Sequence, residues 1–457
     1  MRKLFGTNGV RGILNKSISV ETLVRLGYAI GTYFEGGRLL VGMDGRIGSP
    51  IAKEATVSGL LAAGCEVLDL GLAPTPVIQY DARFNEVDGC VIFTASHNPP
   101  EYIGVKVCGS DGVEIPREGE EKIESIFFEG SYKLAEWDMV GRVRNVTGSI
   151  ERYIEAVIRH VDRHLIAKHR YRVVVDPGNG VSSLTIPHIL KALGCEVYTI
   201  NDHIDGRFPG RLPEPSEENL SGLIKAVKVF DADLGVAYDG DGDRAVFVDE
   251  EGVFHPGDRS LALIEDYVME KKPGAILVTP VSTSQVVDDI AERRGGRVIR
   301  VKVGSVDVSW AMKKLNAELG GEENGGVFYG LHQPVRDGGI TTVLILHILA
   351  VRDMKLSEAL SMLPVYHIIK RRVQCRDEFK HKILSILEEK VKDIGIKVEK
   401  VDGLKIWLDN REWVLIRPSG TEPIYRVIAE APSYERAEKL AEEYTKLIIE
   451  TARSLSG

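Results

Sequence analysis

The chain has 457 residues, of which 44% are hydrophobic and 27% charged, and its formal net charge is −9. This length predicts about three domains, give or take one, with cores large enough to fold without disulfides or a structural metal. The acidic balance argues against nucleic acid as a partner, because the densest basic cluster is the short run Lys370-Arg371-Arg372.

A strand–turn–helix–strand pattern recurs along the chain. It occupies residues 38–71, residues 171–200 and, more weakly, residues 274–301. The first two copies end their helices in similar sequences, LLAAGCEV at 60–67 and LKALGCEV at 190–197, where a glycine lets the chain turn into the next strand. Strands that alternate with helices predict α/β units with mainly parallel sheets.

The C-terminal part of the chain departs from this pattern. A helix is predicted at 377–392 and a final helix at about 433–454, with Ser433 as its N-cap. Between these helices the sequence predicts close-set strands at 397–401, 404–408, 413–417 and 425–429. Short turns between neighbouring strands predict an antiparallel sheet covered by helices.

These patterns predict three similar α/β domains with mixed, mainly parallel sheets, and one C-terminal α+β domain with an antiparallel sheet. We place the boundaries near residues 148, 250 and 363. The predicted domains are therefore residues 1–148, 149–250, 251–363 and 364–457.

The first candidate site is the loop at residues 94–100 (TASHNPP), which follows the apolar strand predicted at 89–93. Open α/β sheets place ligands at this end of a strand. Ser96 is a candidate nucleophile, and His97 and Lys106 offer positive charge or proton transfer. A serine that only satisfies a turn is the alternative interpretation. The G-x-S-x-G pattern of the α/β-hydrolases is absent.

The second candidate site is the run Asp239-Gly240-Asp241-Gly242-Asp243-Arg244, between strands predicted at 232–238 and 245–248. Three carboxylates at alternate positions can converge on one hard cation and would repel one another without it. An EF-hand needs glycine where Arg244 stands and needs helices on both sides. We therefore predict Mg²⁺ here, with calcium or a solvated acidic turn as alternatives, and expect Arg244 to face phosphate oxygens.

The third candidate site is the glycine-rich segment 320–326 (GGEENGG). Its glycines let the backbone approach a ligand, and Glu322 and Asn324 can exchange hydrogen bonds with sugar hydroxyls. A flexible turn without a ligand is the alternative.

The fourth candidate site is the segment 417–423 (RPSGTEP), with Arg426 close behind it. Two hydroxyl groups, backbone N–H groups around a glycine, and arginines on both sides suit a phosphate. An ordinary turn with an N-terminal proline is the alternative.

The location of the protein is predicted from its thiols and its apolar stretches. No CxxC pair occurs among the five cysteines, Cys65, Cys90, Cys108, Cys195 and Cys375, which favours a reducing compartment. The first residues lack the apolar core of a signal peptide. The apolar stretch at 338–351 is too short to span a bilayer and predicts a buried helix. We expect a cytoplasmic protein without a membrane partner.

Taken in order, these four sites and the opening sequence FGTNGVRG at residues 5–12 resemble the α-D-phosphohexomutase superfamily, from one end of the chain to the other. The resemblance implies four domains around a central cleft, each contributing one motif. It implies an enzyme that interconverts hexose 6-phosphate and hexose 1-phosphate through a phosphoserine and a hexose 1,6-bisphosphate. Small sugar phosphates are then its partners, and a trace of the bisphosphate serves as the primer.

The resemblance also implies roles for individual residues. Ser96 is similar to the phosphoserine, and Arg11, His97 and Lys106 match cleft positions near the transferred phosphoryl group. One Mg²⁺ per chain would be held by Asp239, Asp241, Asp243 and a phosphoserine oxygen. The implied substrate contacts are Arg244, Glu322, Asn324, Arg417, Ser419, Gly420, Thr421 and Arg426.

One departure from the family pattern concerns Gly326, because many relatives carry a histidine there. That histidine is a candidate proton-transfer or phosphate-contacting group, so the general base stays unassigned. The EENGG form resembles archaeal phosphoglucosamine mutases or phosphomannomutases. It favours glucosamine phosphate as the substrate, with a phosphomannomutase/phosphoglucomutase of broad specificity as the alternative.

Two further hypotheses come from other classes of protein. A metal-dependent sugar phosphatase would use Ser96 but release inorganic phosphate. A non-catalytic phosphosugar-binding protein would need neither the serine nor the aspartate triad. The sequence fixes neither the oligomeric state nor the resting phosphorylation of Ser96.

Overall fold

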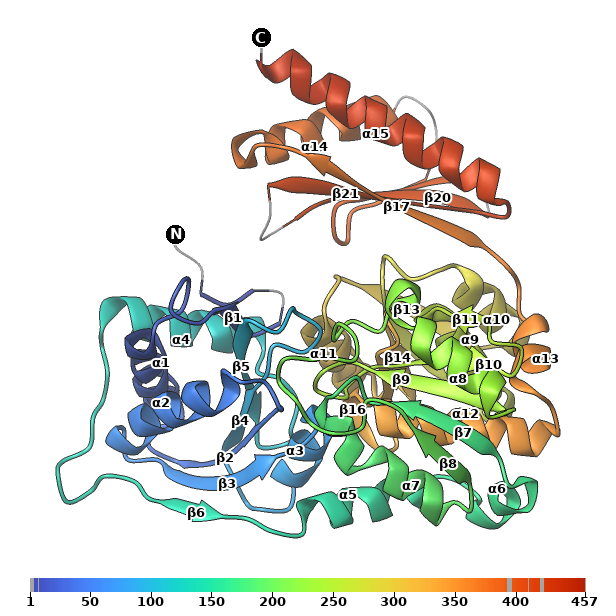
Figure 1. Cartoon of the computed structure of the whole chain (residues 1–457). Coiled ribbons are helices and arrows are strands. Elements are labelled where there is room, and N and C mark those ends of the chain that lie inside the picture. Colours follow the sequence, from blue (N-terminus) through green and yellow to red (C-terminus); the bar gives the residue numbers. More distant parts are fainter. Residues whose placement is uncertain (1–3, 7, 393–396, 410, 420–422, 457) are drawn as a thin grey trace.

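The computed structural model describes residues 4–6, 8–392, 397–409, 411–419 and 423–456. Figure 1 shows three α/β units packed together and a C-terminal unit that lies above them. Three mixed sheets and one antiparallel sheet confirm the predicted fold class. Within the described ranges, no helix combines the length and the apolar character needed to cross a membrane.

The first unit is built on a mixed sheet. In spatial order its strands are β1 (Val10–Ile13), β5 (Tyr102–Gly109), β4 (Gly89–Phe93), β2 (Arg38–Met43), β3 (Glu66–Leu72) and β6 (Val143–Asn145). Its helices are α1 (Val20–Tyr33), α2 (Ser49–Ala62), α3 (Thr75–Ala82) and α4 (Arg117–Glu129). Helices α1 and α2 cross closely at two glycines. A Cβ on Gly27 would lie 2.2 Å from the Thr56 carbonyl oxygen, and one on Gly59 would lie 2.3 Å from that of Val24.

The second unit repeats this plan on a smaller scale. Its strands in spatial order are β11 (Phe254–His255), β10 (Ala245–Asp249), β9 (Leu234–Tyr238), β7 (Arg172–Asp176) and β8 (Glu196–Thr199). Its helices are α5 (Ser149–Ile158), α6 (Arg163–His169), α7 (Ile186–Ala192) and α8 (Ser221–Val229), with short 3₁₀ turns at Val181–Leu184 and Glu217–Asn219. Strand β7 pairs in parallel with both β8 and β9.

The third unit carries the weaker copy of the repeat. Its strands in spatial order are β13 (Arg297–Val301), β12 (Ile276–Pro280), β14 (Leu319–Gly321), β15 (Val327–Tyr329) and β16 (Gln333–Arg336). Its helices are α9 (Gly257–Lys271), α10 (Val286–Arg294), α11 (Ser305–Leu315), α12 (Gly338–Arg352) and α13 (Leu356–Ser361). The predicted buried helix at 338–351 is α12.

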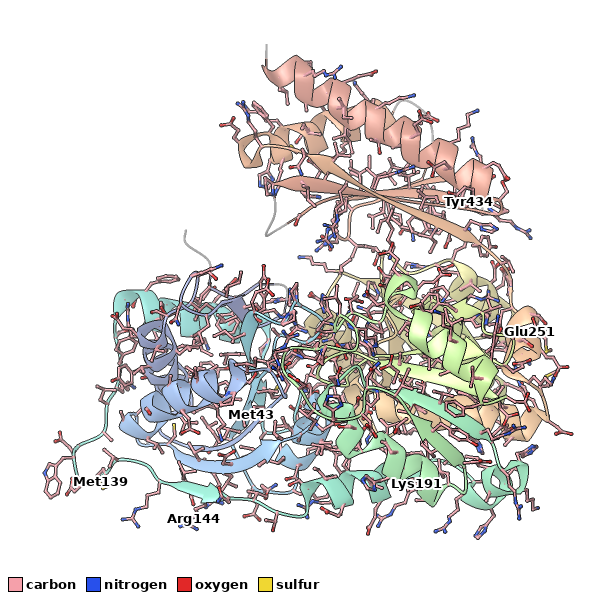
Figure 2. All side chains as sticks on the ribbon, viewed as in Figure 1. Met43, Met139, Arg144, Lys191, Glu251 and Tyr434 are labelled. Carbon is pink, nitrogen blue, oxygen red and sulfur yellow. The ribbon has the colours of Figure 1, made fainter. Side chains whose placement is uncertain are left out.

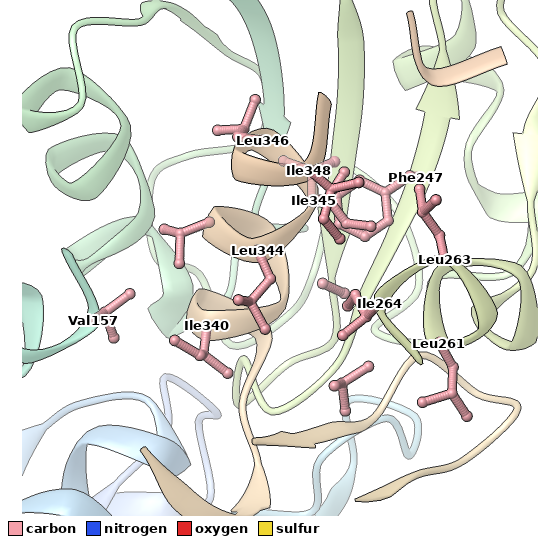
Figure 3. Packing of buried hydrophobic residues seen from close by; sticks show 14 of the residues in the cluster. Val157, Phe247, Leu261, Leu263, Ile264, Ile340, Leu344, Ile345, Leu346 and Ile348 are labelled. Carbon is pink, nitrogen blue, oxygen red and sulfur yellow. The ribbon is translucent and has the colours of Figure 1, made fainter. Parts of the chain in front are cut away.

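Helix α12 lies in the largest apolar cluster of the described residues. Asp337 caps it by accepting hydrogen bonds from the backbone N–H groups of Gly339 and Ile340. Figure 3 shows Ile345 and Ile348 of this helix beside Phe247 of β10. A buried aliphatic side chain of this size contributes about 1.5–3 kcal/mol, so α12 joins the second and third units firmly.

The C-terminal unit has a wholly antiparallel sheet. Its strands in spatial order are β17 (His367–Gln374), β21 (Ile424–Ala431), β20 (Glu412–Pro418), β19 (Leu404–Asp409) and β18 (Val398–Glu399). Helices α14 (Asp377–Lys392) and α15 (Tyr434–Ser456) cover one face of it. The other face contacts the third unit through Trp413, Leu415 and Ile428, which pack against Val281.

Candidate active site

Ser96 lies in the loop that follows the fully buried strand β4. Its backbone has a φ of 49°, a left-handed conformation that costs a non-glycine residue about 1–3 kcal/mol unless the surroundings enforce it. The Ser96 N–H donates to Thr94 Oγ1 at 2.9 Å, and Thr94 Oγ1 donates to Asp44 Oδ2 at 2.7 Å. The serine is therefore held in an unusual conformation by a buried polar network.

Arg46 supplies most of that network, and the sequence analysis did not identify it. It lies just beyond the end of β2, whose last residue, Met43, is labelled in Figure 2. Its buried guanidinium donates to the carbonyl oxygens of Ser96 at 2.5 Å, Asn98 at 2.6 Å and Pro99 at 2.6 Å. Its Nε donates to Asp44 Oδ2 at 3.1 Å. The available signal was the Asp-Gly turn of the first repeat, which ends in this arginine.

The carboxylates of Asp239, Asp241 and Asp243 converge between β9 and β10. All three side chains are buried, and one oxygen of each lies within 4.8 Å of the others. Ser96 Oγ donates to Asp239 Oδ2 at 2.6 Å. Oδ1 of Asp241 and Oδ1 of Asp243 are buried and accept no hydrogen bond. Buried carboxylate oxygens without a donor fit a hard divalent cation, so this group could hold a metal ion.

The three carboxylates differ in their charge environment. Burial, followed by the charges of Asp241 and Asp243, raises the pKa of Asp239 well above its ordinary value. Burial alone would also raise the pKa of Asp241, but the Lys106 ammonium and a hydrogen bond from Thr75 lower it below the ordinary value. A cation beside Asp239 would relieve the repulsion that its neighbours impose.

Lys106 projects from β5 into the triad. Its Nζ lies 2.9 Å from Asp241 Oδ2 and 3.2 Å from Asp243 Oδ2. Burial would lower the pKa of this ammonium, but Asp241 and Asp243 raise it above its ordinary value, so Lys106 stays charged. Lys106 therefore places a buried positive charge next to the predicted metal ligands.

Three more predicted residues surround Ser96. Arg11 donates from Nη1 to Asn98 Oδ1 at 2.7 Å. His97 Nδ1 lies 3.5 Å from Ser96 Oγ, and the pKa of this imidazole is lowered by the Arg244 guanidinium and then by burial. The structure thus places Arg11 and His97 at the serine loop, and Lys106 and Arg244 at the aspartate triad that Ser96 Oγ contacts.

The glycine-rich segment of the third unit meets the carboxylate loop. Its turn is closed by the Glu322 N–H, which donates to the Gly326 carbonyl oxygen at 2.9 Å. The Ala245 N–H of β10 donates to the Gly325 carbonyl oxygen at 3.1 Å, which ties the two loops together. Burial raises the pKa of the Glu322 carboxyl, which accepts from Arg336 Nη1 at 3.2 Å. Sequence patterns did not identify Arg336 either, because it follows Gly326 by ten positions in the sequence and no local motif connects the two residues.

The fourth predicted site lies on the C-terminal unit, which Figure 1 shows above β4 and β9. Arg417 and Arg426 are direct partners on β20 and β21, and Arg417 Nε donates to Asp402 Oδ2 at 2.6 Å. The Ser419 carbonyl oxygen accepts from Lys380 Nζ at 2.6 Å. Gly420 and Thr421 lie outside the described residues.

The same row of the sheet holds a third arginine. Arg372 of β17 is the direct partner of Arg426 on its other side. Directly opposed like charges destabilise a sheet, so three arginines in one row are an unusual arrangement that an anion would relieve. The short basic run noted in the sequence was the signal for Arg372.

Comparisons with known proteins agree along the whole chain. Four phosphoglucomutase/phosphomannomutase family profiles match in order: alpha/beta/alpha domain I at residues 2–133, domain II at 151–252, domain III at 256–366 and the C-terminal domain at 372–447. The chain belongs to this family, within the α-D-phosphohexomutase superfamily. It is a phosphosugar mutase, an isomerase that acts as an intramolecular phosphotransferase.

Three individual proteins illustrate the similarity. The chain is 44% identical to a phosphoglucomutase/phosphomannomutase of Thermococcus kodakarensis, covering 99% of this chain and 100% of the other. It is 41% identical to a phosphoglucosamine/phosphogalactosamine mutase of Sulfurisphaera tokodaii, covering 98% and 99%. A crystal structure of a phosphoglucomutase/phosphomannomutase family protein from Burkholderia thailandensis superposes with a TM-score of 0.87, at 28% identity, over 98% and 97% of the two chains.

Proposed function

We propose that Ser96 carries the phosphoryl group of this phosphohexomutase. The observation that carries the proposal is the 2.6 Å contact between Ser96 Oγ and Asp239 Oδ2, inside a buried group of three carboxylates. A serine hydroxyl held at a strained bend is oriented for one reaction partner. A turn serine of purely structural use would need neither the carboxylates nor the buried Arg46.

We propose that Asp239, Asp241 and Asp243, with an oxygen of phosphorylated Ser96, hold one Mg²⁺ per chain. A bound Mg²⁺ would offset the negative charge that spreads over a phosphoryl group during its transfer. The unpartnered Oδ1 atoms of Asp241 and Asp243 support this assignment over a solvated acidic turn, because all three side chains are buried.

The proposed reaction moves one phosphoryl group at a time. The bond between phosphorus and Ser96 Oγ breaks, and phosphorus bonds to the free hydroxyl oxygen of a hexose phosphate. The proton that this hydroxyl releases is balanced by the proton that Ser96 Oγ takes up as it leaves. The resulting hexose 1,6-bisphosphate reorients within the site, so that its two ends exchange places. Its other phosphate then returns a phosphoryl group to Ser96. Arg11, His97, Lys106 and Arg244 are the proposed contacts to the transferred group, and their positions at the serine loop and the aspartate triad support this role.

We assign the non-reacting phosphate to the C-terminal unit. Arg417, Ser419, Gly420, Thr421 and Arg426 are the proposed contacts, and the opposed pair Arg417–Arg426 supports the assignment. Glu322 and Asn324 are the proposed contacts to sugar hydroxyls. Glu323 beside them lies 3.5 Å from Lys370 of β17, so the sugar loop and the phosphate site adjoin.

The substrate we favour is glucosamine phosphate, because the EENGG segment resembles that of archaeal phosphoglucosamine mutases and the chain is 41% identical to one such enzyme. A phosphomannomutase/phosphoglucomutase of broad specificity is the second candidate, and the 44% identity to an enzyme of that name favours it. The values of kcat/KM for the 1-phosphates of glucosamine, mannose and glucose, with Mg²⁺ and a trace of bisphosphate, distinguish the two.

The role of Ser96 is tested with Ser96→Ala. We expect mutase turnover to fall by about 10³-fold or more, and the mass of one phosphoryl group to disappear from protein primed with hexose 1,6-bisphosphate. Chelation of divalent cations should abolish wild-type turnover, and added Mg²⁺ should restore it. Full mutase activity in Ser96→Ala would refute the proposal, and release of inorganic phosphate without isomerisation would identify a phosphatase instead.

The proposal extends to organisation and location. We place the domain boundaries near residues 148, 250 and 363. We also propose a cytoplasmic enzyme that needs neither a nucleic acid nor a membrane as a partner. All five cysteines lie within the described residues, and they are buried and form no disulfide, which supports a reducing compartment.

A further inference from the structure

Arg336 connects three units of the molecule at the active site. It is the last residue of β16 and is only 5% exposed. Its Nη2 donates to Asp243 Oδ2 at 2.7 Å, and its Nη1 donates to Glu322 Oε2 at 3.2 Å. With the amide of Asn8 oriented to satisfy its neighbours, Asn8 also accepts from Nη2 at 2.8 Å. One guanidinium thus joins the carboxylate loop, the sugar loop and the N-terminal segment.

Gly326 provides the space that this arginine occupies. A Cβ built on Gly326 would lie 2.5 Å from Arg336 Cδ and 2.9 Å from Cγ, which is too close for any real side chain. The aliphatic part of Arg336 has little freedom to yield, because its guanidinium is bonded at both ends. Any side chain at position 326 would therefore displace Arg336 from Asp243 and Glu322.

We infer that Gly326 and Arg336 form a matched pair, in which Arg336 is a positioning residue for phosphoryl transfer. It sets the distance between Glu322, which contacts the sugar, and Asp243, which belongs to the metal loop. The inference rests on the proposed roles of these two carboxylates. Small errors in such a distance cost about 10²-fold in rate, so the arrangement matters for turnover more than for binding.

A double-mutant cycle tests the pair. We expect Arg336→Ala and Gly326→Ala each to lower kcat by about 10- to 100-fold, with little change in KM because the non-reacting phosphate is held by the C-terminal unit. The double variant should be no worse than Arg336→Ala alone, because the new methyl group then has nothing to displace. Arg336→Gln keeps a long polar side chain and guards against a variant that fails to fold.

The matched control is Gly222→Ala on the exposed side of α8, where the new Cβ would meet only Ile200 Cδ1 at 3.9 Å. It should keep wild-type kinetics, and melting temperatures confirm that each variant is folded. Wild-type kcat in Arg336→Ala and Arg336→Gln would overturn the inference, as would a double variant whose loss is the product of the two single losses. Failure of the wild type to isomerise sugar phosphates would instead refute the proposed function on which the inference rests.

Discussion

The region around Ser96 and the phosphate site of the C-terminal unit are built in opposite ways. Around Ser96, buried side chains from three units interlock, and the guanidinium groups of Arg46 and Arg336 hold loops from several directions. In the C-terminal unit, the opposed arginines 417 and 426 lie on two strands of a single sheet. The reacting groups are therefore pre-organised by contacts between three units, whereas all described residues of the phosphate site belong to the C-terminal unit.

The region around Ser96 contains two buried Arg–Asp pairs in equivalent positions. Arg46 follows β2 and binds carbonyl oxygens in the loop after β4. In the second unit, Arg211 is paired with Asp176 at the end of β7, at 2.8 Å, and donates to the Tyr238 carbonyl oxygen, at 2.6 Å, just before the aspartate triad. Each buried Arg–Asp pair braces the loop of the neighbouring strand. Two repeats of one fold thus fix the serine and the carboxylates that meet each other.

Among the tests of this contrast between the two regions, the largest effect is expected when Arg46 is replaced. Arg46→Ala leaves the buried Asp44 carboxylate without its charged partner and removes the donor to the Ser96 and Asn98 carbonyl oxygens, which we expect to destabilise the protein by about 3–5 kcal/mol. Arg46→Lys keeps the charge but cannot reproduce the forked contacts, and should lower kcat by about 10²-fold while the protein stays folded. Steady-state kinetics and thermal unfolding measure both effects.

A control for Arg46→Lys is Arg25→Lys on α1. Arg25 also donates to a carbonyl oxygen, that of Phe127, at 3.2 Å, but far along the chain from the serine loop. This control should lose some stability and keep its kcat. If Arg46→Lys keeps wild-type kcat, the serine loop does not need its brace, and the contrast between the two regions disappears.

The contacts of Arg46 and Arg336 could not be predicted from local sequence patterns. The sequence gives clear signals for Ser96, the aspartate triad and most elements, because strand and helix periodicity and glycine-spaced carboxylates are local patterns. The helix of the third copy of the repeat begins at Val286, whose N–H donates to Ser284 Oγ at 3.2 Å, and periodicity alone does not mark this start. Arg336 meets Asp243 across 93 positions, and contacts of that kind arise only from the packing of separate units.

The next effect concerns the phosphate site. Arg426→Ala removes one charge from the arginine row, and we expect KM for the sugar phosphate to rise by about 10- to 100-fold, as for the loss of a charged hydrogen bond of about 1.5–3 kcal/mol. The value of kcat should change much less, in contrast with Arg46→Lys. Initial rates over a range of substrate concentrations separate the two parameters.

A matched control lies on the adjacent strand. Arg371 of β17 alternates with Arg372, so its side chain lies on the opposite face, where it pairs with Glu438 of α15. Arg371→Ala should therefore keep the wild-type KM. An unchanged KM in Arg426→Ala would show that the non-reacting phosphate does not bind at this row of arginines.

The smallest effect is expected at the joint between the third and fourth units. Lys405 is buried there, with its Nζ 3.8 Å from the centre of the Trp413 ring and 2.9 Å from the Val281 carbonyl oxygen that it binds. Burial lowers the pKa of this ammonium well below its ordinary value, and Arg300 lowers it further. At neutral pH the unfolded chain therefore holds this proton more readily than the folded chain does, and the residue opposes folding.

Lys405→Met replaces the amine with an apolar side chain of similar length. The free energy of unfolding at pH 7 should stay the same or rise by about 1 kcal/mol. Wild-type stability should also increase more than that of the variant as the pH rises toward 10, because only the wild-type unfolded chain loses this proton there. Denaturant unfolding at pH 7 and pH 9.5 measures both, with the exposed Lys397→Met as the control. If Lys405→Met instead lowered the free energy of unfolding at pH 7 by several kcal/mol, Lys405 would stabilise the contact between the third and fourth units. That outcome would contradict the contrast between the interlocked region around Ser96 and a phosphate site that belongs to the C-terminal unit alone.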